Sequence, residues 1–534
     1  MGGLSAVWAL PGLPVCFVQL LTTSDQLVNW RRQCGDPVHF VPTMGALHQG
    51  HQQLIQRAAA GLSDRPAAAL VSVFVNPLQF GPGEDLARYP RDLERDAALA
   101  AEAGAAALWA PSPGMIYPEG VEQITQVHPP TALSEGLCGR RRPGHFDGVA
   151  TVVVRLLALV RPARLLLGEK DWQQLVILRR VLADLGSTVV IESCATVRDP
   201  DGLACSSRNR YLTAAQREQA LALPRALQGA ASLVRGGERD PAVLVAAAAQ
   251  QLAAAGLEPE YLELVEAHSL RPLQQLQGLA LLAAAVPCGP SRLIDHLLFM
   301  SRAPIVAIDG PAGAGKSTVT KAFARRLGLV YLDTGAMYRA LTWWVQHQGA
   351  DPAQAAAVGP LLEGLDLQLR HTDAGEQQVL INGHDVSEPI RSPEVTAQVS
   401  VVAAHACVRE ALTGQQQAMG VRGGLVAEGR DIGTAVFPDA ELKVFLTASV
   451  AERARRRAQD LQERGYAVPP LGELEGQIAQ RDHLDSSRAV APLLQAPDAV
   501  ELITDGMAIE TVIQALVDLF RSRVPEELWP SPRH

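Results

Sequence analysis

The chain has 534 residues, of which 48% are hydrophobic and 19% are charged, a balance typical of globular proteins rather than disordered ones. Its 56 acidic and 47 basic side chains give a net charge of -9, so no basic excess suggests nucleic-acid binding. At roughly 100–200 residues per domain, the length allows about three to five domains.

The seven cysteines are scattered and contain no C-x-x-C pair, so neither a metal cluster nor a disulfide framework is expected, and a reducing cytoplasm fits best. The apolar N-terminus contains Pro11 and Pro14 and has no basic residue before Arg31, unlike a signal peptide. We interpret residues 1–14 as an extension without an assigned role. No run of about 20 apolar residues lacks helix breakers, so no membrane span is predicted.

The first half of the chain alternates short apolar strands with helices. The strands are expected at 38–41, 67–75, 164–167 and 189–192, and the helices at 51–60 and 149–160. This order is typical of a doubly wound parallel sheet, here over residues 15–212. From Thr213 onwards, Ala- and Leu-rich helices precede an apolar strand at 261–265, which predicts a small α+β domain over residues 213–295.

A second α/β unit is expected over residues 304–524. Residues 296–303 are predicted to connect it to the first half, and the Pro-rich residues 525–534 to form a mobile tail. Within this unit, residues 379–386 read as a strand that runs into a hairpin turn.

The first chemical motif follows the strand at 38–41 and opens a helix. It reads Pro42-Thr43-Met44-Gly45-Ala46-Leu47-His48-Gln49-Gly50-His51. Ligands bind at the carboxyl ends of strands in an open α/β sheet, and both helix N-terminal amides and imidazoles can stabilise phosphate charge. The alternative is a pair of polar loop histidines, which the preceding strand and the Gly-rich approach make the weaker interpretation.

This motif resembles the H-x-G-H nucleotidyl transferases, and the longer match resembles the pantothenate synthetase family. Four further segments, in the family's order, support the resemblance over about 280 residues. They are Val75-Asn76-Pro77-Leu78-Gln79-Phe80, the stretch Arg142 to Val149, the stretch Gly168 to Gln174, and Ser206-Ser207-Arg208-Asn209.

The resemblance implies that pantoate and ATP form pantoyl-adenylate and pyrophosphate, and that β-alanine then displaces AMP to give pantothenate. Such chemistry needs positioned positive charge and hydrogen-bond donors rather than a protein nucleophile. The resemblance implies the catalytic residues His48, His51, Lys170 and Arg208, and the pantoate and β-alanine residues Asn76, Gln79 and Gln174. It implies Mg²⁺ on the leaving phosphates, and ATP contacts at Met44, Gly45, Ala46, Leu47, His48, Gln49, Gly50, His51, Gly168, Glu169, Lys170, Asp171, Val197, Cys205, Ser206, Ser207 and Arg208.

One position departs from that family, which usually has Met where this chain has Cys205. A contact made by the backbone would survive the change. The simplest interpretation is a small apolar substitute, although a thiol could in principle be reactive.

The second chemical motif, Gly310-Pro311-Ala312-Gly313-Ala314-Gly315-Lys316-Ser317, fills every fixed position of G-x-x-x-x-G-K-[ST]. It lies between an apolar strand at 304–308 and a helix at 318–327, the context of a phosphate-binding loop rather than a chance Gly-rich turn. In such loops the backbone N–H groups cradle phosphates, so ATP contacts are expected over 310–318, including Thr318. The catalytic Lys316 is expected to reach the β- and γ-phosphates, and Ser317 to bind Mg²⁺.

The segment Asp333-Thr334-Gly335-Ala336-Met337-Tyr338-Arg339 resembles nucleoside monophosphate kinases, and bacterial cytidylate kinases in particular. The stretches Ala427 to Thr434 and Arg481 to Arg488 are similar to further signatures of that family, over about residues 304–522. The resemblance implies that Arg488 belongs to a lid, and that CMP is bound by Thr334, Arg339, Ser400, Arg409, Arg430, Asp431, Arg481 and Asp485. A basic run, Arg453 with Arg455, Arg456 and Arg457, fits a lid role and a solvated helix face equally well.

The two resemblances together predict a fused bifunctional enzyme, with ATP and Mg²⁺ used in both halves and no redox cofactor. Small-molecule substrates are the expected partners, without nucleic acid or membrane, and the first half resembles enzymes that are commonly dimers. Two alternatives stay open: one half acts only as a binding or scaffolding module, or the kinase prefers UMP or AMP.

Overall fold

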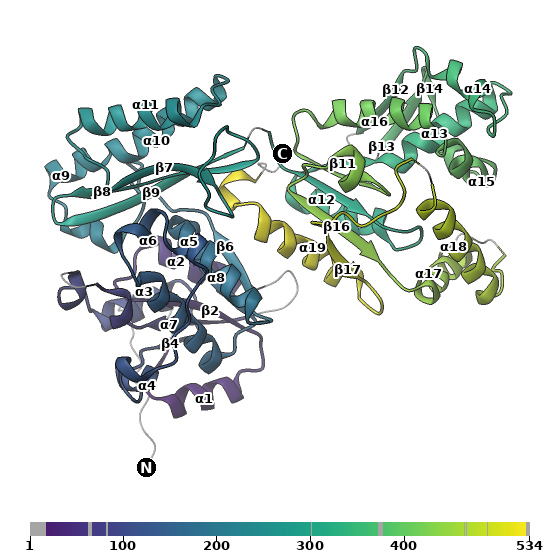
Figure 1. The fold of residues 1–534 in the computed structure, drawn as a ribbon. Helices are drawn as coiled ribbons and strands as arrows, with labels where there is room; N and C mark the ends of the chain where they lie inside the picture. Colours follow the sequence, from purple (N-terminus) through teal and green to yellow (C-terminus); the bar gives the residue numbers. More distant parts are fainter. Residues whose placement is uncertain are drawn as a thin grey trace. The chain divides into compact units, whose positions relative to one another are not determined.

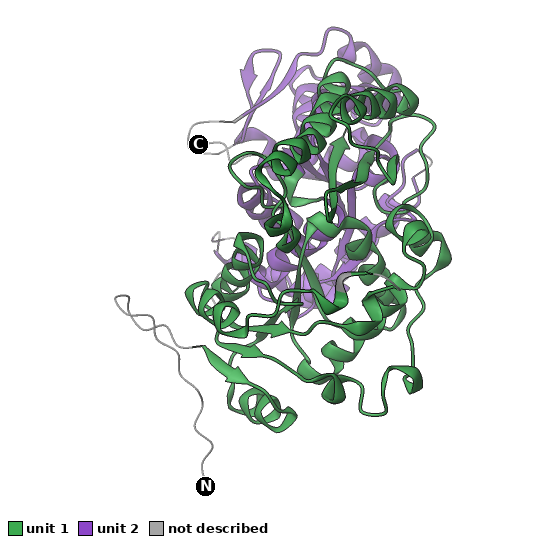
Figure 2. Ribbon diagram, turned by 90° about the vertical axis from the view of Figure 1, so that its left-hand side faces the viewer, with its two compact units in different colours: residues 1–301, 525–527 green, residues 302–524, 528–534 purple. Residues whose placement is uncertain are grey.

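The computed structural model describes residues 18–61, 67–81, 84–300, 302–371, 377–463, 465, 467–488 and 490–529. The chain forms two compact units, which Figure 2 shows in green and purple. Unit 1 contains residues 1–301 and 525–527, and unit 2 contains residues 302–524 and 528–534. Among the described residues, no helix is long and apolar enough to cross a membrane.

Unit 1 is built on a six-stranded parallel sheet in the order β1-β4-β3-β2-β5-β6. Its strands are β1 (Gln19–Leu21), β2 (Val38–Thr43), β3 (Ala68–Val73), β4 (Ala107–Trp109), β5 (Arg164–Gly168) and β6 (Val190–Cys194). The central strands are short apolar runs buried on both faces, as expected for a parallel sheet covered by helices. The doubly wound sheet expected from the sequence is therefore confirmed.

The helices of unit 1 are α1 (Ser24–Gln33), α2 (Gln49–Ala60), α3 (Leu93–Glu102), α4 (Pro113–Ile116), α5 (Thr131–Ser134), α6 (Leu137–Arg141), α7 (His145–Val160), α8 (Trp172–Asp184), α9 (Ala214–Ala220), α10 (Ala222–Arg235) and α11 (Pro241–Ala254). The strand order reverses between β2 and β5, because β3 lies on one side of β2 while β5 lies on the other. Ligands bind at such a switch point, beyond the carboxyl ends of the strands.

The smaller domain of unit 1 has an antiparallel sheet of β7 (Tyr261–Glu266), β8 (Leu279–Cys288) and β9 (Ser291–Met300), with α10 and α11 packed over it (Figure 1). The structure differs here from the sequence-based expectation of a connection at residues 296–303. Residues 296–300 form the second half of β9 and pair with β8 as far as Met300. Leu298 and Phe299 are buried, so this segment belongs to the domain core.

Unit 2 has a five-stranded parallel sheet in the order β11-β15-β10-β16-β17. These strands are β10 (Ile305–Asp309), β11 (Val330–Asp333), β15 (Leu425–Gly429), β16 (Leu442–Thr447) and β17 (Val500–Ile503). Its helices are α12 (Lys316–Leu327), α13 (Thr334–His347), α14 (Ala355–Val358), α15 (Pro393–Val402), α16 (Ala406–Gly420), α17 (Val450–Glu463), α18 (Leu471–Ser486) and α19 (Ile509–Arg523).

A small antiparallel sheet is inserted into unit 2, formed by β12 (Leu367–His371), β13 (Gln377–Ile381) and β14 (His384–Asp385). The hairpin expected at 379–386 is present, with Asn382 and Gly383 at positive φ in its turn. Helices α17 and α18 pack side by side (Figure 1); α17 carries the basic run, and α18 carries the Arg481–Arg488 segment as far as Ser486.

The structure describes part of the expected C-terminal tail and none of the expected N-terminal extension. Residues 1–14, interpreted as an extension, and residues 530–534 of the expected tail lie outside the described residues. Pro525–Glu527, also part of the expected mobile tail, instead belong to unit 1, where they make specific hydrogen bonds.

The burial of Phe299 gives a test of the domain boundary. Phe299→Ala should lower the free energy of unfolding of unit 1 by about 3–5 kcal/mol, because a buried aromatic ring leaves a cavity. Differential scanning calorimetry of the full chain measures this change, with Leu233→Ala as the control, since Leu233 is exposed. A Phe299→Ala effect as small as that of the control would show that residues 296–303 act as a connection.

Candidate active sites

A cavity of about 510 Å³ in unit 1 lies beyond the carboxyl ends of β2, β5 and β6. It brings together most of the residues that the sequence predicted for this half. These are Met44, His48, Gly50, His51, Asn76, Gln79, Gly168, Lys170, Asp171, Gln174, Val197, Cys205, Ser206, Ser207 and Arg208. Gly45, Ala46, Leu47, Gln49 and Glu169, also predicted to contact ATP, do not line it.

His48 and His51 form a reciprocal cap at the start of α2. The backbone N–H of Gly50 donates to Nδ1 of His48 at 3.1 Å, and the N–H of His48 donates to Nδ1 of His51 at 3.3 Å. The ring centroids are 4.0 Å apart. Because both Nδ1 atoms accept hydrogen bonds, each neutral ring carries its proton on Nε2, which can donate to another group.

Both imidazoles are neutral near pH 7. Burial, with a further contribution from the Lys170 ammonium, lowers the pKa of His48 to about 4. Burial, together with His48 and Lys170, holds the pKa of His51 well below its usual value. The pair therefore offers two N–H donors without charge, while Lys170 supplies the positive charge beside them.

A second cavity, of about 350 Å³, lies in unit 2 at the end of β10 and β15. It is lined by every residue predicted for the acceptor and the lid, namely Thr334, Arg339, Ser400, Arg409, Arg430, Asp431, Arg481, Asp485 and Arg488. Residues 312–318 of the Gly-rich loop also line it, whereas Gly310 and Pro311 do not.

Lys316 begins helix α12 directly after Gly315, which has φ +85°. Its Nζ donates to the carbonyl oxygens of Gly310 at 2.7 Å and Pro311 at 2.8 Å. Burial, and then the nearby Arg430 guanidinium, hold the pKa of Lys316 well below its usual value. An anionic ligand at this loop would restore the charged form, as a phosphate-binding lysine requires.

Glu428 is a site residue that the sequence analysis did not single out. Its Oε1 accepts from the Ser317 hydroxyl at 2.5 Å and from Tyr331 at 2.9 Å. Glu428 is buried, and its Oε2 has no hydrogen-bond partner in the described part of the chain. The sequence could have indicated Glu428, because it is a carboxyl residue at the end of β15, the strand that pairs with β10.

The comparisons with known proteins agree with this division into two sites. The family model described as pantoate-beta-alanine ligase matches residues 18–298, and the cytidylate kinase model matches residues 306–522. The chain is 64% identical over 503 residues to a bifunctional pantoate ligase/cytidylate kinase of Prochlorococcus marinus (strain MIT 9313), with 94% of this chain and 99% of that protein covered. The chain belongs to this bifunctional pantoate ligase/cytidylate kinase family.

A second relative of the same description, from Parasynechococcus marenigrum (strain WH8102), is 63% identical and covers 96% of this chain and 100% of that protein. A pantothenate synthetase structure from Thermus thermophilus is 44% identical, covers 52% of this chain and 98% of that chain, and superimposes with a TM-score of 0.49. Units 1 and 2 are called the ligase unit and the kinase unit below.

Two of the predicted ATP contacts in the ligase unit already have another partner. The backbone N–H groups of Ala46 and Leu47 donate to the Asp96 carboxylate at 2.9 and 2.7 Å. Asp96 is buried on α3, and burial raises its pKa. These two amides hold the Gly-rich turn in place through Asp96, so an ATP contact at Ala46 or Leu47 stays a prediction that would need groups other than these N–H donors.

The turn that carries Gln79 is held from several sides. The Asn76 amide nitrogen donates to Gln79 Oε1 at 3.1 Å, and the Tyr117 hydroxyl donates to Asn76 Oδ1 at 2.7 Å. Arg142 Nη2 donates to the Gln79 carbonyl oxygen at 3.0 Å, and His145 Nδ1 lies 2.9 Å from the same oxygen. Arg142 and His145 were quoted in a sequence signature but not assigned to the site, although both line the cavity.

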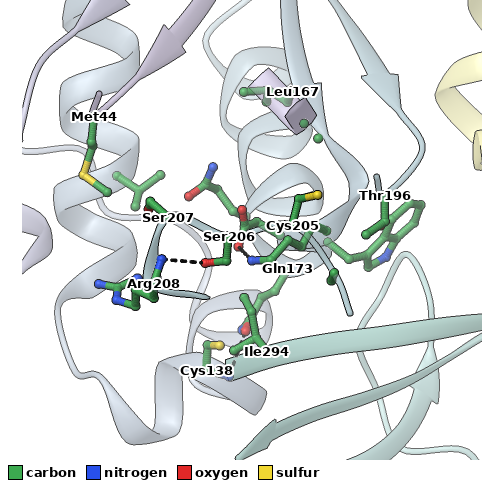
Figure 3. A pocket seen from close by; sticks show the side chains of 18 of the residues that line it. Met44, Cys138, Leu167, Gln173, Thr196, Cys205, Ser206, Ser207, Arg208 and Ile294 are labelled. Atoms are coloured by element: carbon green, nitrogen blue, oxygen red, sulfur yellow. Dashed lines mark hydrogen bonds and ion pairs between the residues drawn. The ribbon is translucent and has the colours of Figure 1, made fainter. Parts of the chain in front are cut away.

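The nucleotide loop, residues 195–208, closes another side of the ligase cavity (Figure 3). The backbone N–H of Arg208 donates to the Ser206 hydroxyl at 3.3 Å, and Arg198 donates to both carboxylate oxygens of Asp295 at 2.7 and 2.9 Å. Cys205 donates from Sγ to Asp199 at 3.2 Å, and burial raises the pKa of its thiol to about 12. Cys205 is therefore a protonated thiol, which agrees with its interpretation as a small substitute for the family's usual Met.

Several arginines line the cavity of the kinase unit. Arg409 pairs with Asp431 at 3.1 Å and Arg430 with Asp485 at 2.9 Å. Burial, followed by the neighbouring arginines Arg430 and Arg409 respectively, lowers the pKa values of Arg481 and Arg488. Guanidinium groups gathered in this way can stabilise an anion such as phosphate in addition to the two carboxylates that they already contact.

The basic run on α17 has a role that neither sequence interpretation described. Arg453 is buried, pairs with Asp482 at 2.6 Å and donates to the Ala312 carbonyl oxygen at 3.1 Å. Arg456, one turn further along the helix, donates to the Ala314 carbonyl oxygen at 3.2 Å. These two arginines hold the phosphate loop from outside, while Arg455 is exposed and pairs with Glu452.

Gly148 sets how closely α7 approaches the Gln79 turn. A Cβ atom at this position would lie 2.1 Å from the Leu78 carbonyl oxygen. Gly148→Ala should therefore lower the free energy of unfolding of the ligase unit by about 1–3 kcal/mol, through overpacking. Thermal unfolding measures the change, with Gly114→Ala as a control, because a Cβ there meets nothing within 4 Å. Equal stability of the two variants would contradict the close approach.

Proposed function

We propose that the ligase unit condenses pantoate with β-alanine through a pantoyl-adenylate, and that the kinase unit transfers the γ-phosphoryl group of ATP to CMP or dCMP. The observation that carries the proposal is that one chain contains two separate cavities, each lined by residues suited to its reaction. The histidine pair and Lys170 line one cavity, and the phosphate loop faces an arginine-lined pocket in the other.

In the first ligase step, a carboxylate oxygen of pantoate attacks the α-phosphorus of ATP, and the bond to pyrophosphate breaks. Negative charge builds on the phosphate oxygens, so donors and cations aimed at them lower the barrier. The Nε2–H groups of His48 and His51, with Lys170 and Arg208, are the groups proposed to do this. Gln79 and Gln174 are proposed to hold pantoate, and the bond from Asn76 orients the Gln79 side chain.

In the second ligase step, the amine of β-alanine attacks the carbonyl carbon of the adenylate. The bond to AMP breaks, the amine loses a proton, and pantothenate is formed. AMP leaves as an anion, and the same donors stabilise it. No protein nucleophile is needed in either step, which agrees with the protonated Cys205 thiol at the cavity wall.

In the kinase unit, a phosphate oxygen of CMP attacks the γ-phosphorus of ATP and ADP leaves. Lys316 is proposed to exchange its two carbonyl partners for phosphate oxygens, and Arg339 and Arg430 to hold the CMP phosphate. Arg481 and Arg488 would neutralise charge spread over the transferred group. Asp431 is proposed to accept from the cytosine amine, a group that uracil lacks.

Magnesium suits the hard oxygen ligands that the kinase site offers. Ser317 Oγ and the unpartnered Oε2 of Glu428 would hold the ion together with phosphate oxygens. The ion would supply positive charge between the β- and γ-phosphates. No group of three or more His, Cys, Asp or Glu side chains among the described residues could hold a metal ion, so the nucleotide would complete its coordination in either unit.

Dimerisation through the ligase unit and a cytoplasmic location are also proposed, on the resemblance of the first half to commonly dimeric enzymes and on the scattered cysteines.

Two substitutions test the division of labour. His51→Ala should reduce pantoate- and β-alanine-dependent AMP formation by at least about 100-fold, because one phosphate donor is lost from the site. Lys316→Ala should reduce CMP-dependent ADP formation by a similar factor. Each variant should keep the other activity within about twofold, since the two sites share no residue. Coupled assays on the intact chain measure both.

The result that would refute the proposal is a wild-type chain in which either unit shows no turnover with its complete substrate set. That unit would then be a binding or scaffolding module.

Glu428→Gln tests the magnesium assignment. The variant keeps the size of the side chain but removes its charge, so the Mg²⁺ concentration for half-maximal kinase activity should rise about tenfold. Binding of Mn²⁺ to the chain with ADP, measured by electron paramagnetic resonance, should weaken similarly. Unchanged metal affinity in both measurements would remove Glu428 from the site.

A further inference from the structure

Three residues far along the chain, Pro525–Glu527, belong to unit 1 rather than unit 2 (Figure 2). Glu526 makes three contacts within the ligase unit. Its backbone N–H donates to Glu169 Oε1 at 2.8 Å, and its Oε2 accepts from the Ala195 N–H at 2.9 Å. Its Oε1 accepts from Arg57 Nη2 at 2.7 Å.

Glu527 extends the same pattern by one residue. Its Oε1 accepts from the Thr196 N–H at 3.2 Å. Two consecutive carboxylates therefore cap two consecutive amides, at the point where β6 ends and the nucleotide loop begins. The next residue of that loop is Val197, which the sequence predicted to contact ATP.

The contact partners of this segment connect it to the carboxyl ends of two neighbouring strands. Glu169 follows β5 directly, precedes Lys170, and accepts from the Ser193 hydroxyl of β6 at 2.9 Å. Arg57 on α2, the helix that the histidine pair caps, also pairs with Glu192 of β6 at 2.9 Å. One short segment thus contacts the helix that begins at the histidine pair and the residues directly before Lys170 and Val197.

Glu526 and Glu527 are absent from the described residues that line the ligase cavity, whereas Ala195 and Thr196 are present. The carboxylates therefore lie behind the wall of the cavity, where they do not occupy the space for ATP. This placement favours support of the wall over inhibition by occupancy.

We propose that Pro525–Glu527 is a positioning segment of the ligase site, which fixes the start of the nucleotide loop and Glu169 so that Lys170 and Val197 meet ATP in the correct geometry. Residues that follow the kinase sequence thereby help to build the site encoded in the first half of the chain. Glu526 and Glu527 are half-buried, and carboxylates that accept backbone N–H groups give strong, directional bonds, which suits this role. The inference rests on the proposed ligase function.

The double variant Glu526→Ala/Glu527→Ala in the full chain tests the proposal. Steady-state kinetics should show a KM for ATP in the ligase reaction raised about 5- to 10-fold, with kcat within about twofold, because charge-assisted bonds to the loop are lost. The kinase reaction should be unchanged. Glu501→Ala is the control, since Glu501 is exposed on β17.

The double variant Glu526→Gln/Glu527→Gln should have a KM for ATP within about threefold of the wild type. Gln keeps an acceptor oxygen at both positions for the N–H groups of Ala195 and Thr196. A double alanine variant with wild-type KM for ATP would overturn the inference, as would an equal fall in kcat for both reactions. A wild-type chain without ligase turnover would instead overturn the proposed function, and the inference with it.

Discussion

Buried carboxylates that accept backbone N–H groups hold the loops of both sites in place. Asp96 accepts from Ala46 and Leu47 in the ligase unit, and Asp309 accepts from Ile432 and Gly433 in the kinase unit at 2.8 and 2.7 Å. Hydrogen bonds to a charged group contribute about 1.5–3 kcal/mol each, enough to fix a loop before substrate arrives. Donors that point at the substrate can then stabilise developing charge without rearranging.

We propose that the two units meet the same demand, the stabilisation of phosphate charge, with different side chains. The ligase unit offers neutral imidazoles whose pKa values are lowered by burial, so they can donate hydrogen bonds without adding fixed charge. The kinase unit gathers arginines, which stay charged even where burial lowers their pKa values. A transferred phosphoryl group spreads its charge over three oxygens, which suits several guanidinium groups.

Sequence patterns predicted most of the strands and helices that carry the sites, because a strand, a Gly-rich turn and a helix follow one another directly in the chain. They failed where a contact comes from far away. The partner of Ala46 and Leu47 is Asp96, on a helix about 50 residues later, and nothing local indicates it. Residues 296–300 of the expected connection form half of β9, and their pairing with β8 was not visible because β8 shows in the sequence only as an apolar run. The contacts of Glu526 lie more than 300 residues away in sequence.

The transfer of a carboxylate oxygen from pantoate to AMP tests the ligase chemistry most directly. Pantoate labelled with ¹⁸O in its carboxylate is incubated with ATP, β-alanine and the intact chain, and the AMP is analysed by mass spectrometry. If pantoate attacks the α-phosphorus and β-alanine then displaces AMP, each AMP carries one labelled oxygen and pantothenate keeps the other. Unlabelled AMP, with the label in inorganic phosphate or lost to water, would contradict the adenylate route.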